Sequence, residues 1–327
     1  RPDAAALLQA STGSHRFVLD YLIEEMLKRQ SEGVRNFLLQ TSVLDSLCGP
    51  LCDAVTGQKG GWSMLAELES GNLFVLPLDD ERRWCRYHHL FADVLRVRLL
   101  DEQPDLVPIL HVRASEWYER EGMRPDAIRH SLSAKDYDRA ADLLELMGPP
   151  ANEGGEITSW LRWARALPEG SVRVRPVLSV WYAYTLLGSG DLEGAEARLA
   201  DAERSATPVQ PGRGPGAVVA DEEQFRLLPA SIGIARSYIA QARGDAAETV
   251  KHAQQVLDFL PEDHIRRTEA TALLAMTSWV SGDLEVADRT FVDVVRRLDA
   301  AGNLADAISA LMVVADIRVA LGRLSEA

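Results

Sequence analysis

Lysine is scarce in this chain of 327 residues, and its scarcity limits what the chain can bind. The four lysines are Lys28, Lys59, Lys135 and Lys251. None lies in a G-x-x-x-x-G-K-[ST] pattern, which excludes a Walker A phosphate loop from this sequence. Acidic residues outnumber basic ones by 49 to 35, giving a formal net charge of −14. A surface of that sign disfavours general binding to DNA or to an anionic membrane.

Cysteine is also rare, and the three thiols form no recognisable chemical site. Their odd number and low density exclude the disulfide framework of a small secreted domain. Cys48 and Cys52 are four residues apart, which would place both on one face of a helix. Because no histidine or third cysteine is spaced nearby as a metal partner, buried packing is favoured over metal binding for this pair.

Long apolar runs and the usual catalytic patterns are missing as well. No stretch reaches the roughly 18 apolar residues of a membrane span. The start, Arg1-Pro2-Asp3, lacks the apolar centre of a signal peptide. Neither an H-E-x-x-H motif nor a recognisable Ser-His-Asp order occurs. We therefore expect a cytoplasmic protein in which this chain is not an enzyme and holds no metal or cofactor of its own.

What the sequence does contain is helical periodicity. Aromatic residues make up only 6% of the chain, whereas alanine and leucine are abundant, a balance that favours closely packed helices. Apolar spacing predicts a helix over about 15–30 and another that Ser31 caps. Further short helices are predicted from Gly49-Pro50 to Val55 and from Trp62 to Gly71. The expected fold class is mainly all-α.

Near residue 80 the helical pattern is interrupted. The apolar run Leu73–Leu76 precedes the turn signal Asp79-Asp80, and Arg83–Tyr87 follows it. These segments predict one small β-hairpin, after which a helical pattern resumes at His88-His89. Three short helices followed by a two-stranded wing is the order of a winged-helix domain, which we place at 32–105.

Past residue 105 one six-residue phrase recurs. Its copies are Gly190–Ala195, Gly244–Thr249, Gly282–Ala287 and Gly322–Ala327, with a looser one at Lys135–Ala140. The glycine would end one helix in a left-handed turn, and the aspartate that usually follows would cap the next helix. Alanine at the sixth position would let the two helices approach closely. Intervals of about 40 residues are typical of a tetratricopeptide-like α-solenoid, predicted over 106–327.

Two irregularities interrupt this repeat pattern. The long interval between Gly190 and Gly244 contains a stretch rich in proline and glycine, about 208–216, which predicts an inserted loop. The last copy stops at Ala327, where its second helix has barely begun. A solenoid normally ends in a capping element, so we expect this one to be C-terminally truncated and the chain to be a fragment.

Several short segments of the sequence resemble those of one protein family. They are Gly13–Arg16, Phe37–Ser42, Gly49–Gly57, Leu78–Trp84 and Arg86–Asp93. The stretch that holds most of them resembles the signal-transduction ATPases with numerous domains (STAND). Within that class it is most similar to the large ATP-binding branch of LuxR-type transcription activators. The similarity continues through the repeats, where it is less specific.

The resemblance implies a longer bacterial protein. Such proteins carry an N-terminal P-loop domain that binds ATP or ADP, a winged helix, a repeat superhelix that senses an effector, and a C-terminal helix-turn-helix that binds DNA. Residues 1–31 would be a helical connector from the nucleotide-binding domain. This chain would hold the winged helix and the sensor, and the whole protein would self-associate when active. Any slow ATP hydrolysis would belong to the P-loop domain.

His88 and His89 are the candidate nucleotide contacts that this resemblance suggests. The wider class has a Met-His-Asp signature at the end of the wing, whose histidine contacts the phosphate of bound ADP. By position His88 matches that histidine, and His89 replaces the aspartate. An imidazole at a helix N-terminus is well placed against a phosphate oxygen. The alternative interpretation is a pair of helix-start residues with no ligand role.

The winged helix itself is not expected to bind DNA. The helix Trp62–Gly71, which would enter a groove, carries Glu67 and Glu69 and has no lysine or arginine. Over residues 32–100, nine acidic residues outnumber seven basic ones. Since DNA binding requires cations that neutralise phosphates, DNA contact is expected only through a domain outside this chain.

Aromatic residues in the repeats are the candidate effector contacts. They are Trp160, Trp163, Trp181, Tyr182, Tyr184, Tyr238 and Trp279. In a concave groove such side chains can stack on sugars or other planar ligands, although at helical spacing they commonly form core. The favoured function is the effector-sensing, regulatory part of an ATP-dependent transcription activator. The alternative is a solenoid scaffold whose groove binds a peptide or a partner protein.

Overall fold

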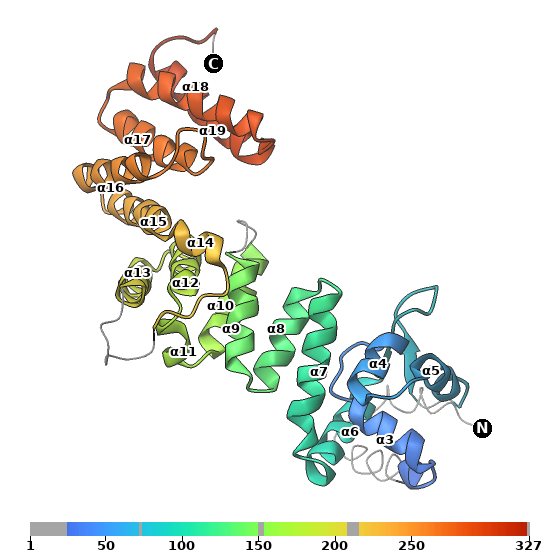
Figure 1. Ribbon diagram of the computed structural model, residues 1–327. Helices are drawn as coiled ribbons and strands as arrows, with labels where there is room; N and C mark the ends of the chain where they lie inside the picture. Colours follow the sequence, from blue (N-terminus) through green and yellow to red (C-terminus); the bar gives the residue numbers. More distant parts are fainter. Residues whose placement is uncertain (1–24, 72–73, 150–153, 208–215, 326–327) are drawn as a thin grey trace, which may run out of the picture. The chain divides into compact units, whose positions relative to one another are not determined.

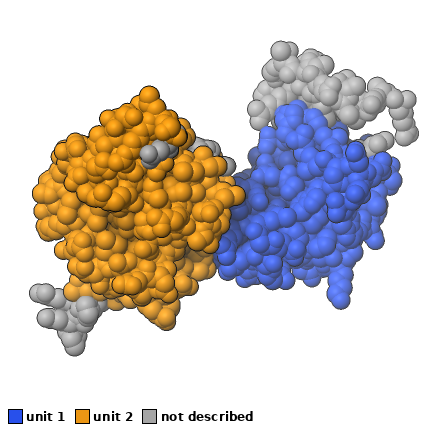
Figure 2. Space-filling model, turned by 90° about the horizontal axis from the view of Figure 1, so that it is seen from above, with its two compact units in different colours: residues 1–143 blue, residues 144–327 orange. Residues whose placement is uncertain are grey.

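The computed structural model describes residues 25–71, 74–149, 154–207 and 216–325 (Figure 1). Most of the helix expected over 15–30 lies outside these ranges, although residues 25–28 are helical. The segment Gly13–Arg16 and most of the inserted loop also lie outside them. Contacts within the chain divide it into two compact units, residues 1–143 and 144–327 (Figure 2). The domain limits expected from the sequence, 32–105 and 106–327, are not tested by this division and remain predictions.

The first unit contains the winged helix. Its elements are α3 (Glu32–Thr41), α4 (Gly49–Thr56), α5 (Gly61–Ser70), β1 (Val75–Pro77), β2 (Cys85–Tyr87) and α6 (His89–Glu102). The hydroxyl of Ser31 accepts the N–H of Val34, so the predicted cap of α3 is confirmed. The chain leaves α4 through Gly57, whose φ of 72° is left-handed. Three helices and then a hairpin confirm the winged-helix order.

The hairpin is held from both sides. β1 and β2 pair antiparallel, with Val75 opposite Tyr87 and Pro77 opposite Cys85. The carboxylate of Asp79 closes the turn by accepting the N–H groups of Arg83 and Trp84 at 2.8 and 2.9 Å. Cys85 also exchanges two backbone hydrogen bonds with Leu47, at 2.7 and 2.9 Å. Because of this extra bridge, which the sequence pattern did not predict, β2 is hydrogen-bonded along both of its edges.

The core of the winged helix lies between the helices and β2. Leu38, Leu51, Phe91 and Leu95 are completely buried there. The hydroxyl of Tyr87 lies 2.7 Å from that of Thr41, which ties the hairpin to α3. The three cysteines are buried free thiols, as the packing interpretation expects. Burial raises the pKa of the Cys85 thiol to about 12, so it remains protonated and unreactive.

The remaining elements of the described chain are helices. They are α7 (Leu106–Arg120), α8 (Arg124–Ser133), α9 (Tyr137–Met147), α10 (Gly154–Ala166), α11 (Glu169–Arg173), α12 (Pro176–Gly188), α13 (Leu192–Ala206), α14 (Glu222–Arg226), α15 (Leu228–Ala242), α16 (Ala246–Phe259), α17 (Arg267–Val280), α18 (Leu284–Ala300) and α19 (Leu304–Ala320). In the second unit, α12–α13, α15–α16 and α17–α18 form successive antiparallel hairpins, and α19 packs on α18. The tetratricopeptide-like solenoid is confirmed.

The recurring phrase builds each hairpin as expected. Gly190, Gly244 and Gly282 adopt φ values between 75° and 87°. The following aspartates, Asp191, Asp245 and Asp283, each accept the backbone N–H three residues later. The small residues at the sixth position, Ala195, Thr249 and Ala287, are 1% exposed or less. In the looser copy, Lys135 takes the place of the glycine at a φ of 60°.

One further turn of this kind was not predicted. Gly302, between α18 and α19, has a φ of 73°, and the side chain of Asn303 accepts the N–H of Asp306. The asparagine replaces the aspartate of the other copies, which hides the pattern in the sequence. The glycine turn therefore also joins one hairpin to the next.

Glu145 fixes the chain beyond the inserted loop. This buried residue of α9 accepts the N–H groups of Ala220 and Asp221 at 2.7 and 3.0 Å. Two residues earlier, Val218 donates its N–H to the carbonyl of Val174 at 2.8 Å. The segment that enters α14 is therefore anchored to two earlier helical regions of the same unit.

We expect Gly282→Ala to lower the free energy of unfolding by about 1 kcal/mol, because a left-handed backbone is costly for any residue with a Cβ atom. No atom lies within 4 Å of the added Cβ, so the cost is conformational. Gly170→Ala is the matched control, since Gly170 lies in α11 with no atom near its added Cβ. Urea unfolding should show a neutral or stabilising effect there; equal losses in both variants would contradict the explanation.

Candidate functional site

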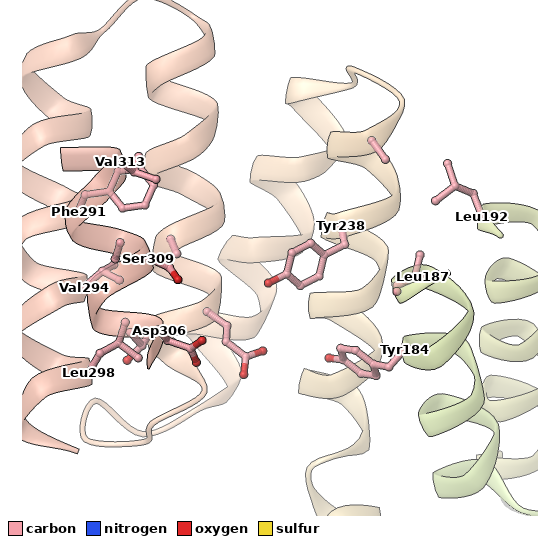
Figure 3. Close-up of a pocket in the computed structure, with 16 residues that line it drawn as sticks. Tyr184, Leu187, Leu192, Tyr238, Phe291, Val294, Leu298, Asp306, Ser309 and Val313 are labelled. Carbon is pink, nitrogen blue, oxygen red and sulfur yellow. The ribbon is translucent and has the colours of Figure 1, made fainter. Parts of the chain in front are cut away.

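A cavity of about 670 Å³ lies on the repeats of the second unit. Its walls come from α12, α15 and α17, which are the first helices of the three hairpins, from α18 and α19, and from Leu192 at the start of α13 (Figure 3). Helices far apart in the sequence thus contribute to a single site. A volume of this size suits a small organic molecule.

Two of the predicted aromatic residues meet in this cavity. Tyr184 on α12 donates its hydroxyl hydrogen to the carbonyl of Ser231 at 3.0 Å. Tyr238 on α15 is 42% exposed, and its hydroxyl points across the cavity toward α19 (Figure 3). Confinement within the protein raises the pKa of Tyr238 to about 12, so its phenol stays neutral. The tyrosines offer the ligand one flat face and one free hydroxyl.

Two carboxylates share the same cavity, and sequence analysis missed both. Glu269 comes from α17 and Asp306 from the first turn of α19. Glu269 is open to the cavity yet surrounded by protein, and this confinement raises the pKa of its carboxyl, with Asp306 adding to the effect. The one signal was that Glu269 is the only acidic residue in its helix.

The rest of the lining is apolar or small. The larger members are Leu187, Leu192, Phe291, Val294, Leu298 and Val313, and the small ones are Gly188, Ala242, Ala272 and Ala310. Thr268 and Ser309 add hydroxyl groups. No lysine, arginine or histidine is among the residues that line the described cavity, so its charge is negative.

The other aromatic candidates lie elsewhere. Trp160 is completely buried, with its ring edge-on to Tyr182 at 5.7 Å. Trp181 is 6% exposed and lies beneath the guanidinium of Arg266. Trp163 is half-buried on α10, and Trp279 packs on the core of α17, α18 and α19. The structure therefore brings Tyr184 and Tyr238 together and places the tryptophans outside the cavity lining.

His88 and His89 lie at the start of α6, as expected from the sequence. His88 precedes the helix, and its backbone N–H donates to the carbonyl of Phe74 at 2.8 Å. The two imidazole centroids are 4.4 Å apart. Nδ1 of His88 is buried and lacks a hydrogen-bond partner among the described residues. Burial, together with His89 and Arg86, lowers the pKa of His88, so it is neutral at pH 7.

An orphaned polar atom at a helix start fits a phosphate ligand. A phosphate oxygen would accept a hydrogen bond from the imidazole and would favour its protonated form. His88 would therefore hold the nucleotide that the resemblance implies, and His89 would flank it. Both assignments remain predictions.

The surface of the winged helix has little free positive charge. Arg82 on the wing pairs with Glu69 of α5 at 3.0 Å, and Arg83 pairs with Glu81 at 2.9 Å. These exposed pairs neutralise much of the one basic cluster that the sequence shows. The arrangement agrees with the expectation that this module does not contact DNA.

The first unit also holds a buried histidine pair that the sequence did not suggest. Nδ1 of His111 on α7 lies 2.8 Å from Nδ1 of His130 on α8, and His130 stacks on Tyr118. Burial, with the charge of Arg129 adding to it, lowers the pKa of His111 to about 4. Burial, with His111 and Arg129 adding to it, lowers the pKa of His130 to about 3. One ring must donate and the other accept, so both are neutral. The partners are 19 residues apart, a separation without a motif.

Within the described residues, no group of three or more histidine, cysteine, aspartate or glutamate side chains could hold a metal ion. Each described helix is too short or too polar to cross a bilayer.

Comparison with known proteins agrees with this geometry. Residues 23–107 match the model of the MalT winged helix domain. The HTH-type transcriptional regulator MalT of Cronobacter sakazakii is 29% identical over 282 residues, covering 86% of this chain and 30% of the relative. Residues 23–107 thus form a MalT-type winged helix, and the chain as a whole is similar to MalT-like proteins. Its MalT-type winged helix precedes the repeats, which is the order that the resemblance of the short sequence segments implied.

Two further proteins are similar to this chain, one in fold and one in sequence. A STAND protein with a tetratricopeptide repeat sensor from Pyrococcus horikoshii has the same fold, with a TM-score of 0.60 at 13% identity over 96% of this chain and 45% of that one. The serine/threonine-protein kinase PknK of Mycobacterium tuberculosis is 35% identical over 208 residues, or 62% of this chain and 19% of the kinase. The chain thus spans less than a third of the length of MalT and of PknK, and less than half of the Pyrococcus protein.

The buried histidine pair predicts a specific dependence of stability on pH. An unfolded histidine has a pKa near 6.5, so below that pH the unfolded chain binds protons that His130 in the folded chain does not. Stability should fall as the pH decreases, by about 2 kcal/mol for His130 between pH 7 and pH 5. Urea unfolding at both pH values measures this loss.

His130→Gln should remove the contribution of His130 to this dependence, because glutamine does not titrate, whereas His111 keeps its own contribution. His264→Gln is the control, a histidine change in the repeats that should leave the contribution of His130 unchanged. The same loss in wild type and His130→Gln would show that the pair is not its source.

Proposed function

We propose that this chain is the regulatory and effector-sensing part of an ATP-dependent transcription activator, in which the cavity on the repeats is the effector site. The observation that carries the proposal is the combination of a MalT-type winged helix with a formed cavity on a tetratricopeptide-like solenoid. The proposal places the protein in the cytoplasm, with DNA contacted only through a separate helix-turn-helix.

The relatives support a sensory rather than a catalytic role. One relative is named as a transcriptional regulator and another as a protein kinase, yet both match this chain. A region found in both a transcriptional regulator and a protein kinase is better explained as a shared regulatory module than as the DNA-binding or the kinase part of either protein. No recognised catalytic constellation in the described residues competes with this interpretation.

The proposed mechanism is a shift between two states. In the resting state the winged helix, through His88, would favour the closed form of the nucleotide-binding domain. Effector binding in the cavity would favour the open form, which self-associates and activates transcription. Such a shift requires that the effector bind the two states with different affinity.

Reading the gene on both sides of this chain tests the proposal most directly. We expect a P-loop domain before it and a helix-turn-helix after it. An open reading frame that encodes neither would refute the activator assignment, and a kinase domain in place of the helix-turn-helix would change the output but not the sensory role.

In the longer protein, we expect His88→Ala to reduce ADP retention after gel filtration by about tenfold, since a charge-assisted hydrogen bond to phosphate would be lost. His264→Ala, a histidine change in the repeats, should retain ADP as the wild type does. Unchanged ADP retention and unchanged activation by His88→Ala would eliminate the proposed nucleotide contact.

A further inference from the structure

The chemistry of the cavity narrows the class of effector. We propose that the cavity binds a small organic cation, in which an ammonium or guanidinium group is attached to an apolar body. This inference rests on the proposed function, because it names the ligand class of the same site.

The first argument is charge. Glu269 and Asp306 both line the cavity, whereas no basic side chain does. Among the described residues no lysine or arginine forms an ion pair with either carboxylate. The charge of Arg266 acts on Glu269, but its guanidinium already donates to Ser231 and to Gln224, the latter at 2.6 Å. The carboxylates therefore remain available to a cation from outside.

The second argument is confinement. The carboxyl groups influence each other, since Asp306 helps to raise the pKa of Glu269. Two like charges in a partly desolvated space destabilise each other, and a cation between them relieves that repulsion. The carboxylate of Asp306 accepts a hydrogen bond from the side-chain amide of Asn303 at 2.6 Å. The backbone N–H of Asp306 donates to the side-chain oxygen of Asn303 at 3.3 Å, which caps α19. Asp306 also lines the cavity, where no basic side chain faces it.

The third argument is the remaining surface. Tyr238 presents an electron-rich ring beside the carboxylates, which favours a cation over a neutral ligand. The apolar wall around Phe291 and Val294 suits an attached hydrocarbon body. A neutral sugar would bury this apolar wall poorly and would leave both charges without a partner.

Calorimetry on the full chain with three matched probes tests the inference. Phenethylamine is a cation at pH 7, 2-phenylethanol is its neutral counterpart, and 3-phenylpropionate is an anion. We expect phenethylamine to bind in the millimolar range, as suits so small a molecule, at least tenfold more tightly than the alcohol, with the acid weakest. Equal affinity for amine and alcohol, or no detectable binding of the amine, would overturn the proposal.

Variants locate the binding. Glu269→Gln and Asp306→Asn should each weaken phenethylamine binding by about tenfold and leave 2-phenylethanol unaffected. Glu262→Gln makes the same change of charge at an exposed position outside the cavity lining, and should leave both probes unaffected. Loss of amine binding in the Glu262 control, or none in the cavity variants, would assign the effect to general surface charge and refute the site.

Failure of this inference can be told apart from failure of the proposed function. Ala310→Leu would fill the cavity from α19 without changing its charge. If this variant abolishes the effector response of the longer protein while the charge variants do not, the sensor remains and its ligand is not a cation. If all of these variants respond like the wild type, the cavity is not the effector site.

Discussion

The left-handed glycine turn is the constraint on which the repeat region depends. It reverses the chain within two residues, and the aspartate that follows satisfies a free N–H at the start of the next helix. Since the sixth residue of the phrase is small, the two helices can pack closely across the turn. Each hairpin therefore has nearly the same geometry. Stacking these hairpins brings α12, α15, α17 and α19 to one cavity.

Within this framework the scaffold and the candidate chemistry use different residues. Tryptophans such as Trp160 fill the core, where their size contributes burial. Tyrosines and carboxylates stand on the helix faces that the stacking leaves open. The winged helix shows a similar separation, because β2 and Tyr87 hold the hairpin in place while His88, the next residue, keeps a polar atom without a partner.

Much of the fold was predictable because its signals are local. Ser31, Gly190 and Asp191 act on their own neighbours in the chain, and the structure confirms each of them. The wing was found from the turn at Asp79, whereas the bridge from Cys85 to Leu47 joins residues 38 apart and leaves no local pattern.

The candidate site was less predictable for the same reason. Helical spacing indicates which residues share a face, but in a solenoid two faces are covered and only one forms the groove. Trp181 and Tyr184 are three residues apart, yet only the tyrosine lines the cavity. Glu269 and Asp306 resemble ordinary surface carboxylates until the stacking places them together. The pair of His111 and His130 likewise depends on the packing of two helices.

The small residues in the cavity lining have an evolutionary consequence. Gly188, Ala242, Ala272 and Ala310 set the space available to a ligand, and none of them forms part of a turn phrase. A single codon change at any of these positions would reshape the cavity while leaving the glycines and caps intact. Selection for stability and selection for recognition would therefore act on separate positions of the repeats.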